Sequence, residues 1–499
     1  MKPLRCAVAV LALAALTACS YPTRNVPADS LDQREGYRWG NLEAGELEDT
    51  LFVVTASGGG TRATTLALAT LKTLHRARLK SGRSLAQEVD IISSVSGGSV
   101  AAGYFAYAGV DGFDTLETDF IRKDGINALL WEGLNPIGLA ELATPSKERI
   151  DLLIDYLDRQ LFADATFDAL LPAEGSSAGD GRPRGQRPLL ILNAADMVTG
   201  TVFPFTQYHL DLLCSDLRQV KLSTAVAASA AFPVAMSPVT LRNYSVCPAQ
   251  ERRADWPPVW IEQALATDYH VNADRLRRGR VARTYAQADQ LEAPFGARYV
   301  HLLDGGTADN LGISEPFRLI TTADVSPTLL NDIMVGRIKR VVFVLVNARS
   351  QAANALNDQL ATPGIVDMLL GTINTSIDNA TFGNLDRIRT LLRERLEAVA
   401  DDPNTPEPVK QRLRGFQSHF LPVDFAAIPD RDCRRTFQAI ATSWTLPDHE
   451  IDALLEVAGP LLAADLEFDR VLQAVGASYA APNAGLQQAC ETVMRAEAS

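Results

Sequence analysis

The stretch Leu51-Phe52-Val53-Val54-Thr55-Ala56-Ser57-Gly58-Gly59-Gly60-Thr61-Arg62 combines two kinds of sequence. Its first six residues are mostly apolar and β-branched, which predicts a buried strand. Three consecutive glycines follow, and leucines at positions 68, 71 and 74 then recur at helical spacing. A strand that passes through a glycine-rich turn into a helix is a building unit of α/β folds.

The same order of elements recurs farther along the chain. Apolar runs predict further strands at residues 89–95, 189–193, 298–303 and 340–347. Because these runs are continuous rather than alternating, we expect a mostly parallel central sheet with helices on both faces. From residue 351 onward the pattern is helical, and Gly459-Pro460 predicts the start of one of these helices. The expected organisation is therefore an α/β domain over residues 51–348 and a helical C-terminal region over residues 349–499.

Three glycine-bearing stretches come directly after predicted strands. They read Ser57-Gly58-Gly59-Gly60, Ser94-Val95-Ser96-Gly97-Gly98 and Asp304-Gly305-Gly306. Ligands of such sheets bind at the carboxyl ends of strands, where all three stretches are expected. The sequence therefore predicts a single site at this edge of the sheet.

Each stretch supplies one component of acyl-ester cleavage. Ser96 stands between a strand and a helix with small neighbours, so a sharp turn can expose its hydroxyl as a nucleophile. Asp304 supplies a carboxylate, and burial would raise its pKa and make it a better general base. Gly58, Gly59 and Gly60 leave backbone amides unshielded, and such donors stabilise an oxyanion by about 3–4 kcal/mol each.

Several alternatives remain open on the residues alone. A phosphate-cradling loop for a nucleotide is disfavoured, because neither a Gly-Lys-Ser/Thr ending nor a G-x-G-x-x-G spacing is present. Arg62 is expected either to hold the glycine loop or to contact a substrate phosphate. The base could also be a histidine, and His209 and His270 stay open as members of a Ser–His–Asp triad.

The ordered motifs resemble the signatures of patatin-like phospholipases. The residues that carry the resemblance are Ser57–Ala63, Ser94–Ser99 and Asp304–Gly312, with similar stretches at Asn193–Asp196, Thr199-Gly200 and Ala228–Pro233. The resemblance covers about residues 51–348, although Ser94 replaces the first glycine of the commonest serine turn. It implies a Ser96–Asp304 dyad, an oxyanion hole of Gly58, Gly59 and Gly60, and hydrolysis of phospholipid or lysophospholipid acyl esters without a metal or cofactor. An acyltransferase, or a lipid-binding envelope lipoprotein without catalysis, are the alternatives.

The N-terminus predicts a targeting segment. Lys2 and Arg5 precede an apolar run over residues 6–18, which is too short to span a bilayer and fits a signal-peptide core. The run ends in Leu16-Thr17-Ala18-Cys19, which resembles a bacterial lipobox and implies lipidation of Cys19. We therefore expect a signal peptide over residues 1–18, a polar tether over residues 19–50, and a lipid-anchored protein of the bacterial cell envelope. Ser20 favours the outer membrane, facing the periplasm.

Charge and cysteine content limit the classes of binding partner, the possible disulfides and the possible metal sites. Removal of residues 1–18 would take away Lys2 and Arg5, so that 45 of the 47 basic residues remain against 60 acidic residues. The formal net charge of the remaining chain is −15. This balance disfavours nucleic acid and electrostatic docking on anionic lipid. Apart from Cys6 and Cys19, the chain has four cysteines, which could pair in three ways. Sequence proximity suggests the pairs Cys214–Cys247 and Cys433–Cys490. No CxxC or clustered Cys/His spacing suggests zinc. Oligomeric state is not determined by these patterns.

Overall fold

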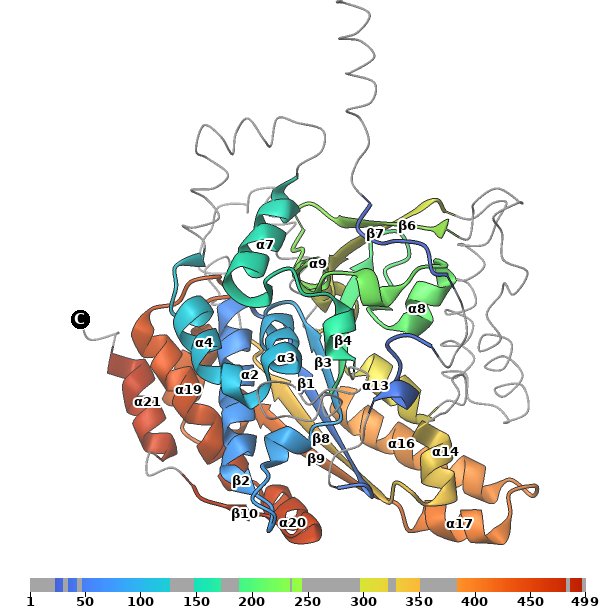
Figure 1. The fold of residues 1–499 in the computed structure, drawn as a ribbon. Coiled ribbons are helices and arrows are strands. Elements are labelled where there is room, and N and C mark those ends of the chain that lie inside the picture. The colour runs from blue at the N-terminus through green and yellow to red at the C-terminus, as the bar shows by residue number, and fades with distance from the viewer. Residues whose placement is uncertain are drawn as a thin grey trace, which may run out of the picture.

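A computed structural model describes residues 23–29, 35–42, 47–125, 148–171, 188–233, 236–244, 297–321, 329–350, 384–481 and 485–495. Its centre is an eight-stranded sheet (Figure 1). The strand order is β6-β7-β4-β3-β1-β8-β9, and β5 pairs with β4 outside this path. The strands are β1 (Thr50–Ala56), β3 (Ile91–Val95), β4 (Leu189–Asp196), β5 (Val202–Pro204), β6 (Val239–Arg242), β7 (Tyr299–Asp304), β8 (Arg340–Asn347) and β9 (Gln417–Asp424). A small separate pair joins β2 (Ala77–Arg78) to β10 (Ser478–Tyr479).

The sheet is parallel over its larger part. Strands β4, β3, β1, β8 and β9 run in one direction, whereas β7 pairs antiparallel with both β4 and β6. The prediction of a mostly parallel sheet in an α/β fold is confirmed. The four strands β4, β3, β1 and β8 are almost wholly buried, as expected of strands covered on both faces.

Helices cover both faces of this sheet. Figure 1 shows α2, α3 and α19 on one side and α13, α14 and α16 on the other. The α-helices of four or more residues are α2 (Gly60–Arg76), α3 (Gly97–Ala108), α4 (Phe113–Leu116), α7 (Arg149–Leu157), α8 (Gln207–Leu212), α9 (Leu222–Ser229), α12 (Gly306–Asp309), α13 (Ser314–Thr321), α14 (Leu329–Val335), α16 (Asn384–Asp401), α17 (Glu407–Arg414), α18 (Arg431–Ala439), α19 (Asp448–Ala463), α20 (Leu466–Val475) and α21 (Leu486–Met494). No helix among the residues described combines the length and the apolar character required to cross a bilayer.

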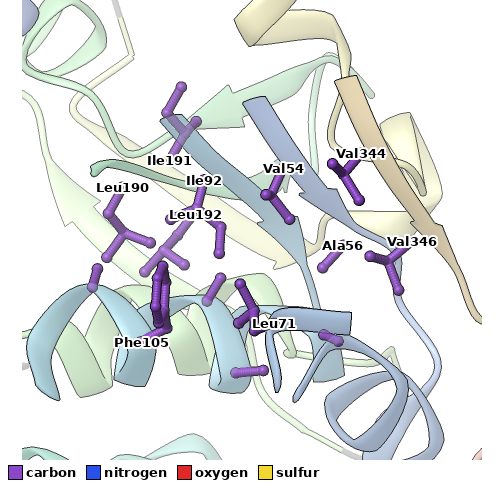
Figure 2. Close-up of a cluster of buried hydrophobic side chains, with 14 of the residues drawn as sticks. Val54, Ala56, Leu71, Ile92, Phe105, Leu190, Ile191, Leu192, Val344 and Val346 are labelled. Carbon is purple, nitrogen blue, oxygen red and sulfur yellow. The ribbon is translucent and has the colours of Figure 1, made fainter. Parts of the chain in front are cut away.

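Part of the core lies between the sheet and α2 and α3. Figure 2 shows side chains of four neighbouring strands above these two helices, which contribute Leu71 and Phe105. Alternate strand residues point toward the helices, because successive side chains of a strand face opposite sides. Val54 and Ala56, and likewise Val344 and Val346, illustrate this spacing. Burial of these side chains fixes the positions of the loops that follow the strands.

The C-terminal region contains a strand of the main sheet in addition to helices. Strand β9 pairs in parallel with β8 from Gln417 to Asp424, so the boundary expected at residue 348 falls between two adjacent strands of one sheet. Pro422 interrupts the apolar pattern of this segment, which makes it read poorly as a strand. The edge position of β9 tolerates Pro422, because one side of an edge strand needs no backbone donor.

Two other expectations for the C-terminal region have different outcomes. Pro460 lies inside α19 rather than at the start of a helix, and the actual break follows at Asp465, whose side chain caps α20 by accepting from the Glu467 amide at 2.8 Å. The suggested Cys433–Cys490 disulfide is present and joins α18 to α21. The other suggested pair involves Cys247, which lies outside the described residues.

Part of the expected N-terminal tether is bound to the body of the protein. Asn25, Tyr37 and Arg38 are each at most 2% exposed. The Arg38 guanidinium forms a buried ion pair with Asp211 at 2.8 Å, and the Tyr37 hydroxyl accepts from the Leu190 amide at 2.8 Å. The polar composition of this segment therefore serves binding to the body, at least over residues 23–29 and 35–42.

Candidate active site

Ser96 occupies a strained turn between β3 and α3. Its backbone has φ 51° and ψ −124°, a conformation that residues with a side chain rarely adopt. The turn packs tightly against the glycine loop. A Cβ atom on Gly97 would lie 2.0 Å from the Gly60 carbonyl oxygen, and one on Gly98 would lie 2.6 Å from the Ser57 carbonyl oxygen. The two glycines after Ser96 are therefore required by this close approach.

Ser229, at the end of α9, holds this turn in place. The Ser96 amide donates to the Ser229 hydroxyl at 2.9 Å, and that hydroxyl donates to the Asn193 carbonyl at 2.6 Å. The Ser229 carbonyl accepts from the Gly305 amide at 3.1 Å. Ser229 is fully buried and connects the loops after β3 and β7 with β4. Its segment was noticed only as part of the family resemblance, since a lone serine in an alanine-rich helix carries no signal of this role.

Asp304 reaches Ser96 through the register of three strands. Val95 pairs with Asn193 of β4, and the next residue of β4, Ala194, pairs with Asp304. The end of β7 therefore lies one strand away from the turn that carries Ser96. Gly305 allows this approach, because a Cβ atom there would lie 2.1 Å from the Asn193 carbonyl oxygen.

The Asp304 carboxylate is hydrogen-bonded to Ser96. The carboxylate accepts from the Ser96 side chain, and its Oδ1 accepts from the Gly306 amide at 2.8 Å. Burial raises the pKa of Asp304 to about 6, and the two hydrogen bonds partly oppose this rise. Asp304 is 3% exposed, whereas Ser96 is only half-buried. The structure thus brings together the two side chains that the sequence analysis paired.

The glycine loop lies directly beside Ser96. A Cβ atom on Gly58 would be 3.3 Å from the Cβ of Ser96. The Gly58 amide donates to the carbonyl and the side-chain oxygens of Asn310, at 3.3 and 3.2 Å. No acceptor within the described ranges occupies the amides of Gly59 and Gly60, which have φ values of 140° and 58°. Of the three glycines expected to form an oxyanion hole, these two have amides available to a ligand.

Arg62 is buried and holds the glycine loop. Its guanidinium donates to the carbonyls of Ala348 (2.8 Å) and Ile440, and to the Thr442 hydroxyl (3.0 Å). Burial lowers the pKa of Arg62 to about 10, and the nearby Glu450 opposes this shift, so the side chain is charged at neutral pH. At 2% exposure, Arg62 presents no surface to a substrate phosphate. The guanidinium also lies beside the glycine loop, because a Cβ atom on Gly59 would be 2.9 Å from its Nη2.

The C-terminal region completes this side of the site. The Thr61 amide donates to the Ser443 carbonyl at 2.8 Å, and a Cβ atom on Gly60 would lie 2.4 Å from that same carbonyl oxygen. The Thr61 hydroxyl donates to the Trp444 carbonyl at 2.8 Å. Residues 440–444 therefore form one wall of the glycine loop, which no motif in the sequence indicated.

The histidine alternative finds no support in these contacts. His209 lies in α8, where its Nδ1 is 3.2 Å from the Thr206 hydroxyl and its ring packs against Phe203. Burial lowers the pKa of His209 to about 4, with an opposing effect of Glu315. None of the hydrogen bonds recorded for His209 reaches Ser96. His270 and Cys19 lie outside the described residues.

The assembled groups form a nucleophile, a base and two amide donors at one edge of the sheet. Ser96 can attack a carbonyl carbon, Asp304 can accept its proton, and Gly59 and Gly60 can bind the resulting oxyanion. Within the part of the chain described above, no group of three or more His, Cys, Asp or Glu side chains is arranged to hold a metal ion.

Comparison with known proteins identifies one family. The sequence model of the patatin-like phospholipase family matches residues 54–317. No curated protein matches the chain. Among solved structures, human GIVD cytosolic phospholipase A2 is similar with a TM-score of 0.31 and 14% identity, over 60% of this chain and 43% of that protein's chain. The matched region thus spans less than half of that structure.

Proposed function

Because the chain belongs to the patatin-like phospholipase family, we propose that it hydrolyses lipid acyl esters through an acyl-Ser96 intermediate, with Asp304 as the general base. The observation that carries this proposal is the hydrogen bond from the Ser96 hydroxyl to the buried Asp304 carboxylate beside the glycine loop, where Gly59 and Gly60 have no amide acceptor among the described residues. Phospholipids and lysophospholipids are the proposed substrates.

In the first half-reaction Ser96 becomes acylated. The Ser96 oxygen attacks the ester carbonyl as its proton moves to Asp304, and the carbonyl oxygen becomes an oxyanion bound by Gly59 and Gly60. The carbon–oxygen bond to the leaving alcohol then breaks, and that alcohol takes the proton from Asp304. The raised pKa makes Asp304 a stronger base than an ordinary carboxylate, and a pKa of about 6 is still low enough for the proton to be returned.

In the second half-reaction water releases the fatty acid. Asp304 accepts a proton from the attacking water, a second oxyanion forms in the same place, and the bond between the acyl carbon and the Ser96 oxygen breaks. The proton on Asp304 returns to Ser96. A lipid alcohol in place of water would make the same chemistry an acyl transfer.

The test compares products formed from phosphatidylethanolamine and phosphatidylglycerol vesicles by mass spectrometry. Free fatty acid and lysolipid should form with the natural chain, and Ser96→Ala should abolish them. Ser418→Ala is the matched control, because Ser418 is exposed on β9 and should leave the yield unchanged. A fluorophosphonate should label Ser96. Absence of a Ser96-dependent adduct would instead favour a lipid-binding lipoprotein without catalysis.

The proposed location follows from the N-terminal sequence. We propose that residues 1–18 are removed and that lipid on Cys19 holds the protein at the bacterial outer membrane, facing the periplasm. Mass spectrometry of the N-terminal peptide from membrane-extracted protein tests this. An acyl-modified Cys19 as first residue is expected, and an unmodified or uncleaved peptide would exclude the anchor.

A further inference from the structure

The N-terminal segment contacts the body of the protein from Arg24 onward, which is five positions after Cys19. The Arg24 guanidinium forms an ion pair with Asp151 of α7. The Asn25 side chain forms two hydrogen bonds with the Arg242 backbone: its Oδ1 accepts from the amide at 2.8 Å, and its Nδ2 donates to the carbonyl at 2.9 Å. The backbone carbonyl of Asn25 accepts from the Tyr244 hydroxyl at 2.8 Å. Asn25 is 1% exposed. The described N-terminal segment is therefore clamped to the edge of the sheet from Arg24 onward.

The clamp leaves only a short connection to the proposed lipid. Arg24 is five positions after Cys19, and even a fully extended chain spans about 18 Å over that separation. This length is smaller than the hydrocarbon thickness of a bilayer. A lipid on Cys19 would therefore hold the Arg24 end of the protein against the membrane surface.

Exposed apolar side chains lie beside this clamp. Strand β6 pairs Arg242, the partner of Asn25, with Tyr299 of β7, which is 51% exposed. On the other side of β7, the Met197 amide donates to the His301 carbonyl at 2.9 Å, and Met197 and Val198 are 50% and 77% exposed. We name Met197, Val198 and Tyr299 the apolar tip. They are three of the five large apolar side chains that are exposed within the described residues.

The apolar tip stands on the same end of the sheet as the candidate active site. Met197 directly follows Asp196, the last residue of β4, and Ser96 follows the adjacent strand β3. Tyr299 is five residues before Asp304 on β7, which corresponds to about 17 Å along a strand. Figure 1 likewise shows the start of the described chain beside β6 and β7. The start of the described chain, the tip and the site therefore share one end of the molecule.

We propose that the apolar tip inserts into the lipid surface that holds Cys19, so that the end of the sheet bearing Ser96 and Asp304 faces the membrane. This inference rests on the proposed lipid anchor. The acidic balance of the chain argues against docking by charge, whereas a small apolar tip beside a short anchor needs no basic patch. Membrane lipids would then reach the site without the protein leaving the surface.

The test uses tryptophan emission and lipids with brominated acyl chains, which quench tryptophan only on contact. Lipidated full-length protein with Ser96→Ala, which prevents lipid turnover, is placed on phosphatidylethanolamine and phosphatidylglycerol vesicles. Val198→Trp probes the tip. Leu466→Trp is the matched control, because Leu466 is 73% exposed at the start of α20 and outside the tip. The parent protein corrects for the five natural tryptophans.

We expect brominated lipid to remove roughly half of the added emission from Val198→Trp and almost none from Leu466→Trp, as for a side chain at the acyl boundary. Equal quenching of the two variants, or none in either, would overturn the proposal. A flexible Gly/Ser insertion after Pro22 should reduce quenching of Val198→Trp, and unchanged quenching would exclude the short connection as its cause. The N-terminal mass separately reports whether Cys19 is lipidated, and turnover by the natural serine separately reports the hydrolase.

Discussion

Replacing Asp304 by asparagine separates its chemical role from its structural one. The amide oxygen can still accept from the Gly306 amide, and the amide nitrogen can donate to the Ser96 oxygen, so the hydrogen bonds keep their places. An amide cannot take the Ser96 proton. We therefore expect Asp304→Asn to lower kcat by about 10²–10⁴-fold, which is the usual contribution of a general base.

The same substitution should stabilise the fold at alkaline pH. Burial raises the pKa of Asp304 from its ordinary 3.8 to about 6, or about two units, and each unit corresponds to about 1.4 kcal/mol. The folded state therefore binds this proton more tightly than the unfolded state. That contribution is fully present below pH 3.8 and is lost as pH rises through 6. Above that pH, the ionised Asp304 costs the folded protein about 3 kcal/mol, and the neutral asparagine avoids this cost.

Two measurements check this reasoning. Hydrolysis of a water-soluble ester gives kcat/KM against pH, which for the natural chain should fall on the acid side near pH 6 as Asp304 becomes protonated. Urea unfolding at pH 8 and at pH 4 gives the stability difference, which should favour Asp304→Asn at the higher pH and largely vanish at the lower. Ser96→Ala is the control, because it is inactive but retains the carboxylate.

Two results would refute the argument. An Asp304→Asn variant that keeps more than about a tenth of the activity would remove Asp304 as the base. A variant less stable than the natural chain at pH 8 would mean that the charge of Asp304 supports the fold, against the direction of its pKa shift.

Four further changes test other parts of the site. Ser229→Ala removes the group that binds the Ser96 amide and should lower kcat about tenfold or more with little change in KM; an unchanged kcat would dismiss its positioning role. Gly60→Ala places a Cβ atom 2.4 Å from a backbone oxygen and should lower both activity and the thermal midpoint, whereas a fully active variant would contradict the packed loop. Arg62→Met strips buried acceptors of their donor and should lower the free energy of unfolding by roughly 3 kcal/mol, measured in urea. Cys433→Ser with Cys490→Ser opens a separation of 57 residues and should cost about 4 kcal/mol of stability while leaving activity at low temperature intact; loss of activity without loss of stability would argue otherwise.

Much of the site could be predicted from local sequence. Glycines that follow apolar runs indicated where strands would end, and Ser96 and Asp304 were paired on the expectation that both strands end at one edge of a parallel sheet. Strand β7 runs antiparallel to β4 instead, and Asp304 lies near Ser96 because it pairs with Ala194 of β4. The small neighbours Gly97 and Gly98 also indicated a sharp turn at Ser96. Local sequence was enough to predict these features, because the apolar run of a strand and the glycines that follow it are neighbours in the chain.

The supporting contacts could not be predicted in the same way. Ser229, Arg62 and the wall at residues 440–444 act through hydrogen bonds between segments that are more than a hundred residues apart. The same holds for Asn25, whose partners lie on β6. In a different fold, a serine, an arginine or an asparagine with the same neighbours in sequence would be exposed to solvent. The local sequence therefore does not indicate these contacts.

Tertiary packing also decided which polar groups became buried. Burial is the largest cause of the pKa shifts of Asp304 and His209, and it moves them in opposite directions, because removal from water disfavours the charged form of each. The sequence contains both residues, and the Asp-Gly-Gly stretch after a predicted strand indicated that Asp304 would lie near Ser96. Their ionisation depends on how much of the surrounding chain excludes water, which is a property of the whole fold.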